Sequence, residues 1–526
     1  MQRPVETFTA AEQELLAPHF TNLDEPVFGL VNLPETVKGA LFARYSRYPG
    51  TLRRLFIDEF ADSLEGGAVA FEGSEGKRAA ELYDRIFLGY GDDSVAQLGG
   101  MHIACEWVSN VMTKILQRPR LAAYLEQSTR YLAWDEPMPG GGYRYHREDL
   151  LGPGYRAAMD RIFDIYSESI PKVVAWAAEA YPPADGESEA AHMRAVKAKA
   201  FDLLRGLLPA ASLAHMGMYA TGQTYEQLIL HLMAHPLPEA REYGAMILRT
   251  VQQVMPSFVA RVERPDRGGE WVAYLESREQ AGRRWSERLG IGAEAAANPG
   301  PSVDLLSFEG SEDALLAALL FEASGQSERQ ISDVVSGLSA DDRGQLLADM
   351  VGTRANRRHR PGRGLESLRY RFEVVADYGA FRDLQRHRML TVQWQTLSPF
   401  LGAGVPSEVE QAGCGDSYRE ALDVSARAWE ALMSAGHASH APYALCLGYR
   451  IRFILDLNAR EAMQLIELRS GREGHPTYRA VAIAMRDRIA EAHPSVAAMM
   501  THVDEESEPR LERMMSELKA EAKQSA

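Results

Sequence analysis

One stretch of the chain places apolar and polar positions in a helical period. Within "GYRIRFILDLNAREAMQLIELR", residues 448–469, six positions recur at alternating steps of four and three: Ile451, Leu455, Asn458, Ala462, Leu465 and Arg469. This spacing predicts a single helix with the six side chains on one face. At about 1.5 Å of rise per residue, the polar Asn458 and Arg469 would lie roughly 16 Å apart, the span of a nucleotide. A helix whose ends emerge into water would show the same pattern, which therefore leaves both interpretations open.

Pro, Gly and Ser gather near the middle of the chain. They end residues 278–302, and "VDLLSF" at 303–308 then predicts a short buried strand. The chain has 526 residues, whereas a single hydrophobic core stops growing at about 250–300 residues. We therefore expect two domains, residues 1–300 and 301–526.

The two halves share one order of segments. Each has an early helical stretch, a Gly-containing loop, a segment that leads into a QRxR motif, and later a long amphipathic helix. The first half carries two further segments, residues 138–154 and 182–200, which we expect to be surface insertions.

Composition restricts the class of protein. With 46% hydrophobic and 25% charged residues and no apolar N-terminal stretch, the sequence predicts a soluble, cytoplasmic protein with no membrane partner. The net charge of -16 disfavours a nucleic-acid polymer as partner. Cys105, Cys414 and Cys446 are far apart and lack CxxC spacing, so neither a disulfide framework nor a metal site is expected.

Concentrated positive charge marks the QRxR motifs. Residues 385–388 read QRHR and residues 117–120 read QRPR. Guanidinium groups bind phosphate in a planar, bidentate way, so two arginines two residues apart suit a pyrophosphate or a nucleotide. His387 taken alone is more often a structural or exposed histidine. A second RHR within residues 354–364 is more typical of a solvated face or a mobile loop.

The segment "YLEQSTRY", residues 124–131, follows the first motif. A carboxylate, two hydroxyls and an arginine lie within five residues of one another. Such a group supplies an acceptor for a ring N–H or hydroxyl and donors for one phosphate. A helix N-cap with a local salt bridge is the alternative interpretation.

At these motifs the chain resembles the flavin-dependent thymidylate synthases, whose hallmark is the continuous string RHR-x-x-S-x-N-E-x-S-x-R-Y. Here the hallmark is split between the halves. The second half supplies Arg386, His387 and Arg388, but Trp394, Thr396 and Ser398 stand at the Glu, Ser and Arg of the family. The first half supplies Glu126, Ser128, Arg130 and Tyr131, but Pro119 stands at the family's histidine.

The downstream residues divide in the same way. Asn458 and Arg460 match the family's flavin-binding asparagine and arginine, Gln464 replaces a second asparagine, and Arg469 falls at the arginine that contacts the uracil ring. The first half has Thr221, Gln223 and Leu232 at three of these positions. It keeps a nucleotide-binding arginine at Arg205, where the second half has Pro442. In the second half, Glu366 resembles a glutamate of the family that contacts the flavin. Three positions before that glutamate the family has a small hydroxyl residue. Ser94 of the first half resembles this residue, whereas the second half has Arg363 there.

In this family each nucleotide site is shared between subunits, and the losses in this chain follow that division. The resemblance therefore implies one composite site in a duplicated, fused chain, with its mirror image lost. It implies an FAD site and a dUMP site. The flavin residues would be Ser94, Glu366, Arg386, His387, Arg388, Asn458, Arg460 and Gln464. The nucleotide residues would be Glu126, Ser128, Thr129, Arg130, Arg205, Arg386 and Arg469, with Arg469 as the catalytic group.

The resemblance also implies the reaction and the architecture. The reaction is reductive methylation of dUMP to dTMP, with methylenetetrahydrofolate as carbon donor, reduced FAD as hydride source and NADPH as reductant. The fold is α/β (α+β): each half is a mostly antiparallel sheet flanked by helices, and the halves pack as a pseudo-twofold pair. Two chains would form a homodimer that reproduces the family's tetramer.

Four departures from the family keep other functions open. Asp383 stands at a glutamine that contacts the nucleotide, Leu125 replaces an asparagine, and Ala123 and Thr391 both replace a serine. One alternative is methyl or hydroxymethyl transfer to a different pyrimidine nucleotide. The other is a flavin- or nucleotide-binding protein that has lost catalysis.

Overall fold

The computed structural model describes residues 6–24, 28–45, 48, 50–61, 97–130, 132–138, 141–183, 187–292, 300–514 and 517–518. The chain divides into two compact units. Unit 1 comprises residues 1–107, 115–126 and 215–292, and unit 2 comprises residues 108–114, 127–214 and 293–526. This division differs from the predicted halves, because a large part of the first half packs with the second. That the first copy of the duplicated domain ends at residue 300 and the second begins at residue 301 stays a prediction.

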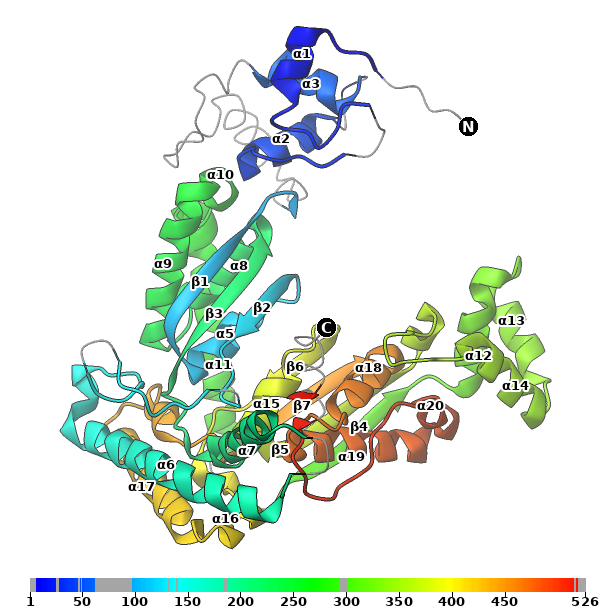
Figure 1. The fold of residues 1–526 in the computed structure, drawn as a ribbon. Coiled ribbons are helices and arrows are strands. Elements are labelled where there is room, and N and C mark those ends of the chain that lie inside the picture. The colour runs from blue at the N-terminus through cyan, green and yellow to red at the C-terminus, as the bar shows by residue number, and fades with distance from the viewer. Residues whose placement is uncertain are drawn as a thin grey trace. The chain divides into compact units, whose positions relative to one another are not determined.

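Unit 1 is built on a three-stranded sheet in the order β1-β3-β2 (Figure 1). Strand β2 (Ala122–Glu126) pairs antiparallel with β3 (Leu213–Thr221), and β1 (Gly100–Ser109) lies on the other side of β3. Thr221 ends β3 and caps α8 (Gly222–Met233), because its side chain accepts a hydrogen bond from the Thr224 N–H. Among the described residues, the other α-helices that lie wholly in this unit are α1 (Ala10–Leu16), α2 (Glu35–Tyr45), α3 (Leu52–Glu59), α9 (Pro238–Val254), α10 (Pro256–Val259) and α11 (Glu270–Leu289).

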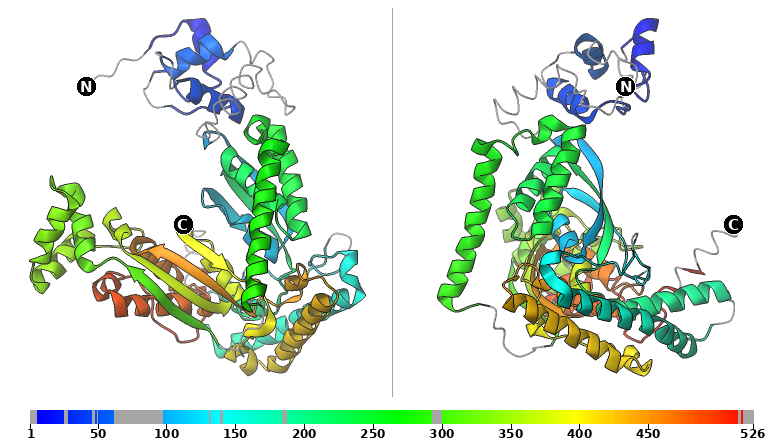
Figure 2. Two further views of the ribbon diagram at one scale, coloured as in Figure 1. Left: turned by 180° about the vertical axis from the view of Figure 1, so that it is seen from behind. Right: turned by 90° about the vertical axis from the view of Figure 1, so that its left-hand side faces the viewer.

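Unit 2 is built on a four-stranded antiparallel sheet in the order β4-β5-β7-β6. The strands are β4 (Ser302–Glu309), β5 (Arg369–Asp377), β6 (Leu390–Trp394) and β7 (Arg450–Asn458). Helix α19 (Pro476–Ala492) packs on β4 and β5 (Figure 2, left). The remaining α-helices of this unit are α6 (Gly152–Ala180), α7 (Glu189–Leu204), α12 (Glu312–Leu320), α13 (Glu328–Ser336), α14 (Ala340–Val351), α15 (Tyr378–Leu384), α16 (Ser407–Gln411), α17 (Gly415–Ser434), α18 (Ala459–Arg469) and α20 (Pro494–Ala498). Helix α5 (Asn110–Leu116) spans the division between the units.

The predicted single helix over residues 448–469 is wrong in its first half. Residues 450–458 form β7, and only residues 459–469 form α18. Ile451, Phe453, Leu455 and Leu457 are all buried, so the apolar positions of "RIRFILDLN" follow a period of two. β-Branched and aromatic side chains at these positions favour a strand. Positions 451 and 455 fit both the two-residue period of a strand and the four-residue step of a helix, so the predicted helix wrongly included residues 448–458.

The strand predicted at residues 303–308 is present, but its predicted burial is wrong. It lies within β4, the edge strand of the sheet, which has no buried residue. Leu306 and Phe308 are 53% and 51% exposed. An edge strand pairs on one side only, so apolar composition alone did not determine its burial.

The order of strands repeats between the halves and confirms the tandem duplication. β3 lies between β1 and β2, just as β7 lies between β5 and β6. The QRPR motif falls between α5 and β2, and the QRHR motif falls between α15 and β6. Backbone hydrogen bonds repeat as well: Asn110 and Val111 donate to Ser212 and Ala210, and the equivalent Tyr378 and Gly379 donate to Tyr449 and Leu447.

Equivalent segments of the two halves also meet within unit 2. Pro209 and Cys446, which occupy the same place in their halves, form an antiparallel bridge. Around it, Gly448 N–H donates to Gly206 O. A Cβ at Gly206 would lie 2.1 Å from the Tyr418 hydroxyl, so this approach requires glycine. The segments are related by a local pseudo-twofold axis, as predicted for the duplicated pair.

The two segments expected as surface insertions are partly buried. Most of residues 182–200 lie in α7 (Glu189–Leu204), whose Ala195 and Lys199 are 1% and 2% exposed. Tyr145, in the other segment, is 1% exposed and stacks on Phe163. The prediction is therefore wrong for these parts, because small alanine side chains let α7 pack closely against α6.

Within the described part of the chain, no helix is both long enough and apolar enough to cross a membrane.

Candidate functional site

A buried ion pair fixes the arginine of the first-half motif. Arg130 donates to both carboxylate oxygens of Asp202, from Nε at 2.7 Å and from Nη2 at 2.6 Å. It also donates from Nη1 to the Tyr478 hydroxyl at 2.9 Å and from Nη2 to the Glu473 carbonyl at 3.1 Å. Burial opposes the charge, but Asp202 outweighs it and raises the pKa of Arg130. Arg130 is therefore a fixed cation held in one orientation.

Asp383 lies among the arginines that the resemblance assigns to the nucleotide. Arg205 Nη1 donates to Asp383 Oδ2 at 3.2 Å. Burial would raise the pKa of this carboxyl, but the charges of Arg205, Arg386, Arg469 and Arg130 together hold it well below its usual range. Two of these arginines come from the first half and two from the second, so the predicted nucleotide arginines converge on one carboxylate within unit 2.

Arg205 itself is buried at 3% exposure. Its Nη2 has no hydrogen-bond partner, although the Asp377 carboxylate lies 3.9 Å away. Gly379 of α15 lies against the same guanidinium: a Cβ there would come within 3.1 Å of both Nε and Nη2.

Gly379→Ala tests this contact. We expect weaker nucleotide binding, because the added methyl would displace Arg205, and the check is the dUMP affinity by calorimetry. Gly344→Ala in α14 is the matched control, since its Cβ would meet nothing within 4 Å. That control is expected to raise stability by about 0.5–1 kcal/mol without changing affinity. Equal affinities for the two variants would contradict the contact.

His387 lies inside a chain of hydrogen bonds rather than at the surface. Arg469 Nε donates to His387 Nε2 at 3.1 Å, so the other ring nitrogen, Nδ1, carries the proton and donates to Glu461 Oε1 at 2.8 Å. Burial, reinforced by the charge of Arg469, lowers the pKa of His387. A neutral His387 thus positions the Arg469 guanidinium.

His475 is a second buried, neutral histidine near the arginines. Its Nε2 donates to the Asp202 carbonyl at 3.0 Å, and its Nδ1 accepts from the Thr477 N–H at 3.3 Å. Burial, then the charges of Arg205 and Arg130, lower its pKa well below the ordinary value.

These two histidines predict an acid-sensitive fold. Their folded-state pKa values lie below the unfolded value of about 6.5, so protons bind the unfolded chain first as the pH falls. Stability is therefore complete above about pH 7 and decreases through pH 6 and 5, by up to about 1.4 kcal/mol per pH unit for each histidine. Urea unfolding at a series of pH values measures the slope, and His475→Gln is expected to reduce it. A slope that His475→Gln leaves unchanged would contradict the assignment for His475.

Tyr478 joins the two key arginines. Its ring lies 5.8 Å from the guanidinium carbon of Arg130 and 5.7 Å from that of Arg469, within the range of a cation–π interaction. Sequence reasoning missed Tyr478, Asp202 and Glu461. Nothing in their spacing marks Tyr478 or Asp202, whereas Glu461 was detectable as the residue three after the helix cap Asn458.

The predicted flavin residues divide into two groups. Arg386 and Arg388, both from the QRHR motif, are exposed. Arg460 and Glu366 lie in contact, because Arg460 Nη1 donates to Glu366 Oε1 at 3.3 Å. Asn458, in contrast, caps α18 by accepting from the Glu461 N–H at 2.9 Å. Gln464 is half-buried on the same helix.

The remaining predicted site residues are placed as follows. Ser128 accepts from the Arg130 N–H at 3.2 Å in a local turn, and the buried Thr129 hydroxyl accepts from Arg382 Nη1 at 3.5 Å. Glu126 ends β2 in unit 1 and accepts from Gln117 Nε2 at 2.9 Å. Ser94 and Tyr131 lie outside the described residues.

The second RHR segment is only partly the solvated loop that was predicted. Arg357, Arg358 and His359 are exposed. Arg354, however, forms a buried ion pair with Glu467 at 2.5 Å, and its Nε donates to the His359 carbonyl at 2.7 Å. The exposed part is thus anchored to α18.

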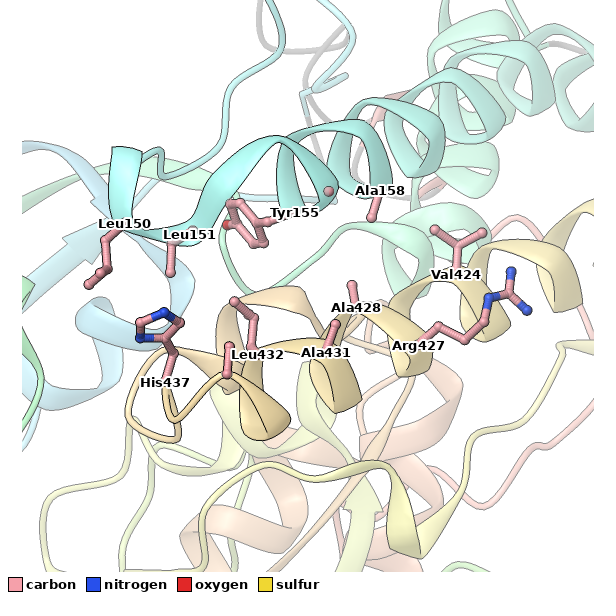
Figure 3. A pocket seen from close by; sticks show the side chains of 12 residues that line it. Leu150, Leu151, Tyr155, Ala158, Val424, Arg427, Ala428, Ala431, Leu432 and His437 are labelled. Atoms are coloured by element: carbon pink, nitrogen blue, oxygen red, sulfur yellow. The ribbon is translucent and has the colours of Figure 1, made fainter.

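A separate hollow of ≈ 370 Å³ lies between α6 and α17 (Figure 3). Leucine, alanine and valine side chains make up most of its lining, with Tyr155, Arg427 and His437 as its polar members. This lining carries no paired acid and base, so the hollow supports no chemistry.

The three cysteines are buried and free. Burial raises the pKa of the Cys105 thiol to about 11 and that of the Cys446 thiol to about 12. Neither is a thiolate at neutral pH, so neither is a ready nucleophile.

Comparison with known proteins shows the family of the chain. The family described as "Thymidylate synthase complementing protein" matches residues 54–257 and again residues 311–495. The chain belongs to this family. The two matched segments confirm the resemblance to flavin-dependent thymidylate synthases and its tandem arrangement.

Relatives of the thymidylate synthase complementing family match along nearly the whole chain. A UPF0159 protein of Chlamydia muridarum is 35% identical over 531 residues, which cover 98% of this chain and 99% of that protein. The UPF0159 protein Ta1429 of Thermoplasma acidophilum is 28% identical over 522 residues, which cover 92% and 99%. A crystal structure of the UMP/dUMP methylase PolB from Streptomyces cacaoi bound with 5-Br dUMP is 19% identical. It covers 40% of this chain and 98% of that chain, with a TM-score of 0.32.

Proposed function

We propose that this protein catalyses flavin-dependent reductive methylation of dUMP to dTMP at one composite site in each chain. One observation carries the proposal. Arg205 from the first half donates to Asp383, and the charges of Arg130 from the first half and of Arg386 and Arg469 from the second also lower the pKa of that carboxyl. These are four of the residues that the family resemblance assigns to the nucleotide, and the mirror-image positions hold Leu232 and Pro442 in place of two of them.

The arginines suit a nucleotide monophosphate. Guanidinium groups bind phosphate oxygens in pairs, and the buried Arg205 has an Nη2 without a hydrogen-bond partner. Arg130 and Ser128 would hold the phosphate together with Arg205. Arg469, positioned by neutral His387, would place a fixed positive charge where negative charge develops on the uracil ring, which is typically worth a few kcal/mol.

The residues also fit an FAD. Arg386 and Arg388 present two exposed guanidinium groups in one short loop, which suits a pyrophosphate, and Glu366 and Arg460 would contact it as a pair. Gln464, half-buried on α18, is expected to contribute as well, whereas Asn458 caps that helix and both ring nitrogens of His387 are engaged by Glu461 and Arg469. When bound, reduced FAD supplies the hydride, methylenetetrahydrofolate supplies the carbon, and NADPH restores the reduced flavin.

An anaerobic assay tests the proposal. Purified protein with FAD, NADPH, dUMP and methylenetetrahydrofolate is expected to give dTMP, identified by mass spectrometry, and Arg469→Ala is expected to lower turnover by about 100-fold or more. A flavin that NADPH reduces but that dUMP and the folate never reoxidise would favour the non-catalytic alternative. Parallel reactions with UMP and dCMP test for a different pyrimidine nucleotide, to which Asp383 and Leu125 point.

We propose a homodimer as the assembly, because the family places flavin among neighbouring subunits. Light scattering of the purified protein with and without FAD measures it directly.

A further inference from the structure

Two carboxylates touch the arginine cluster in different ways. Asp202 holds Arg130 through two short hydrogen bonds, of 2.6 and 2.7 Å. Asp383 receives a single longer one, of 3.2 Å, from Arg205 Nη1. Asp202 is 3% exposed, whereas the Asp383 side chain keeps 17% of its surface. Asp202 thus has the geometry of a permanent partner, and Asp383 that of a replaceable one.

Arg205 is incompletely satisfied in this arrangement. Asp383 engages only Nη1, and Nη2 is buried without a hydrogen-bond partner. The Asp377 carboxylate, 3.9 Å from Nη2, already accepts a hydrogen bond from the Ala380 N–H as the cap of α15. A buried guanidinium N–H is normally paired. A bidentate phosphate would engage two guanidinium N–H groups at once, which Asp383 does not.

We propose that Asp383 is the resident counter-ion of the phosphate subsite: it neutralises Arg205 in the free protein and is exchanged for the phosphate of the incoming nucleotide. This inference rests on the proposed function and deepens it. A ligand must carry enough negative charge to displace a carboxylate, so the site selects a dianionic phosphomonoester. It rejects a neutral nucleoside and binds single-charged anions poorly.

The test compares two substitutions that remove the same charge beside the same arginine. Asp383→Asn frees Arg205 from its resident anion. Asp377→Asn is the matched control, because asparagine caps a helix about as well as aspartate does. Calorimetry at fixed ionic strength measures binding of dUMP, deoxyuridine and inorganic phosphate to each protein. We expect Asp383→Asn to increase the affinity for both dUMP and inorganic phosphate by about tenfold. The increase for Asp377→Asn is expected to be clearly smaller. Deoxyuridine is expected not to bind the native protein.

Either of two results would overturn the inference. Unchanged or weaker phosphate binding by Asp383→Asn would show that the carboxylate supports the site rather than competing for it. An equal gain in affinity for Asp377→Asn would show that any lost negative charge near Arg205 strengthens phosphate binding, without exchange of a carboxylate for the phosphate. Should Asp383→Asn fail to fold, Asp383→Ser provides the same comparison, read as the phosphate-induced rise in melting temperature.

The same experiment separates this inference from the proposed function. If inorganic phosphate distinguishes the two variants while dUMP binds no more tightly than phosphate alone, the exchange stands and the dUMP assignment fails. If dUMP binds the native protein and Arg469→Ala abolishes that binding, but Asp383→Asn brings no gain, the function stands and the exchange fails.

Discussion

Arg386→Ala is expected to weaken dUMP binding by about 100-fold, whereas Arg118→Ala is expected to change it by less than about twofold. The two arginines hold the same place in the QRHR and QRPR motifs, and both are exposed. Of the two, Arg386 alone is among the arginines whose charges lower the pKa of Asp383; the others are Arg130, Arg205 and Arg469. In the proposed complex the nucleotide phosphate would pair with Arg386 and cover it, and truncating one partner of a buried, hydrogen-bonded charge pair typically costs about 2–5 kcal/mol, which is the basis of the expected loss.

Calorimetric titration of dUMP into both variants measures this difference, and their melting temperatures control for folding. Pro119 and Leu232 stand where the second half has His387 and Arg469, so the proposed single site gives Arg118 no nucleotide to bind. A loss of affinity in Arg118→Ala as large as that in Arg386→Ala would show that both copies of the motif bind nucleotide.

Asp202→Asn is expected to destabilise the fold by about 3–5 kcal/mol. Asp202 is 3% exposed, and its partner Arg130 would remain buried without its counter-charge. The free energy of unfolding in urea, followed by tryptophan fluorescence, measures the loss. The same substitution also frees Arg130 to move, so nucleotide binding should fall together with stability.

The matched control is Asp266→Asn. Asp266 pairs with Arg264 in the same bidentate manner, but its side chain is 58% exposed. Exposed ion pairs contribute little to stability, so no measurable change is expected there. Equal effects of the two substitutions would mean that burial does not determine the strength of the Arg130–Asp202 pair.

The duplication could be predicted from the sequence because the repeated motifs are local. QRPR and QRHR fall at equivalent places between a helix and a strand. Thr221 and Asn458, aligned through the family resemblance, both end a strand and cap the following helix. Local backbone geometry of this kind is encoded in a few neighbouring residues.

The partners of the site arginines could not be predicted in the same way. Asp202 lies in α7, two residues beyond the segment 182–200 that was predicted to be a surface insertion, and Tyr478 lies in α19. Both reach Arg130 only through tertiary packing. His387 was assigned to the flavin by resemblance, yet its two ring nitrogens bond Glu461 and Arg469. The strand β7 was mistaken for a helix because the residues shared by the two periods were counted for the helix alone.

The number of flavin and dUMP molecules bound per chain distinguishes one composite site from two. The purified protein is incubated with FAD, freed of excess flavin by gel filtration, and quantified by its visible absorption; dUMP is then titrated calorimetrically. We expect a ratio close to one flavin and one dUMP per chain, with the dUMP signal lost in Arg469→Ala. A ratio close to two for either ligand would contradict the single composite site.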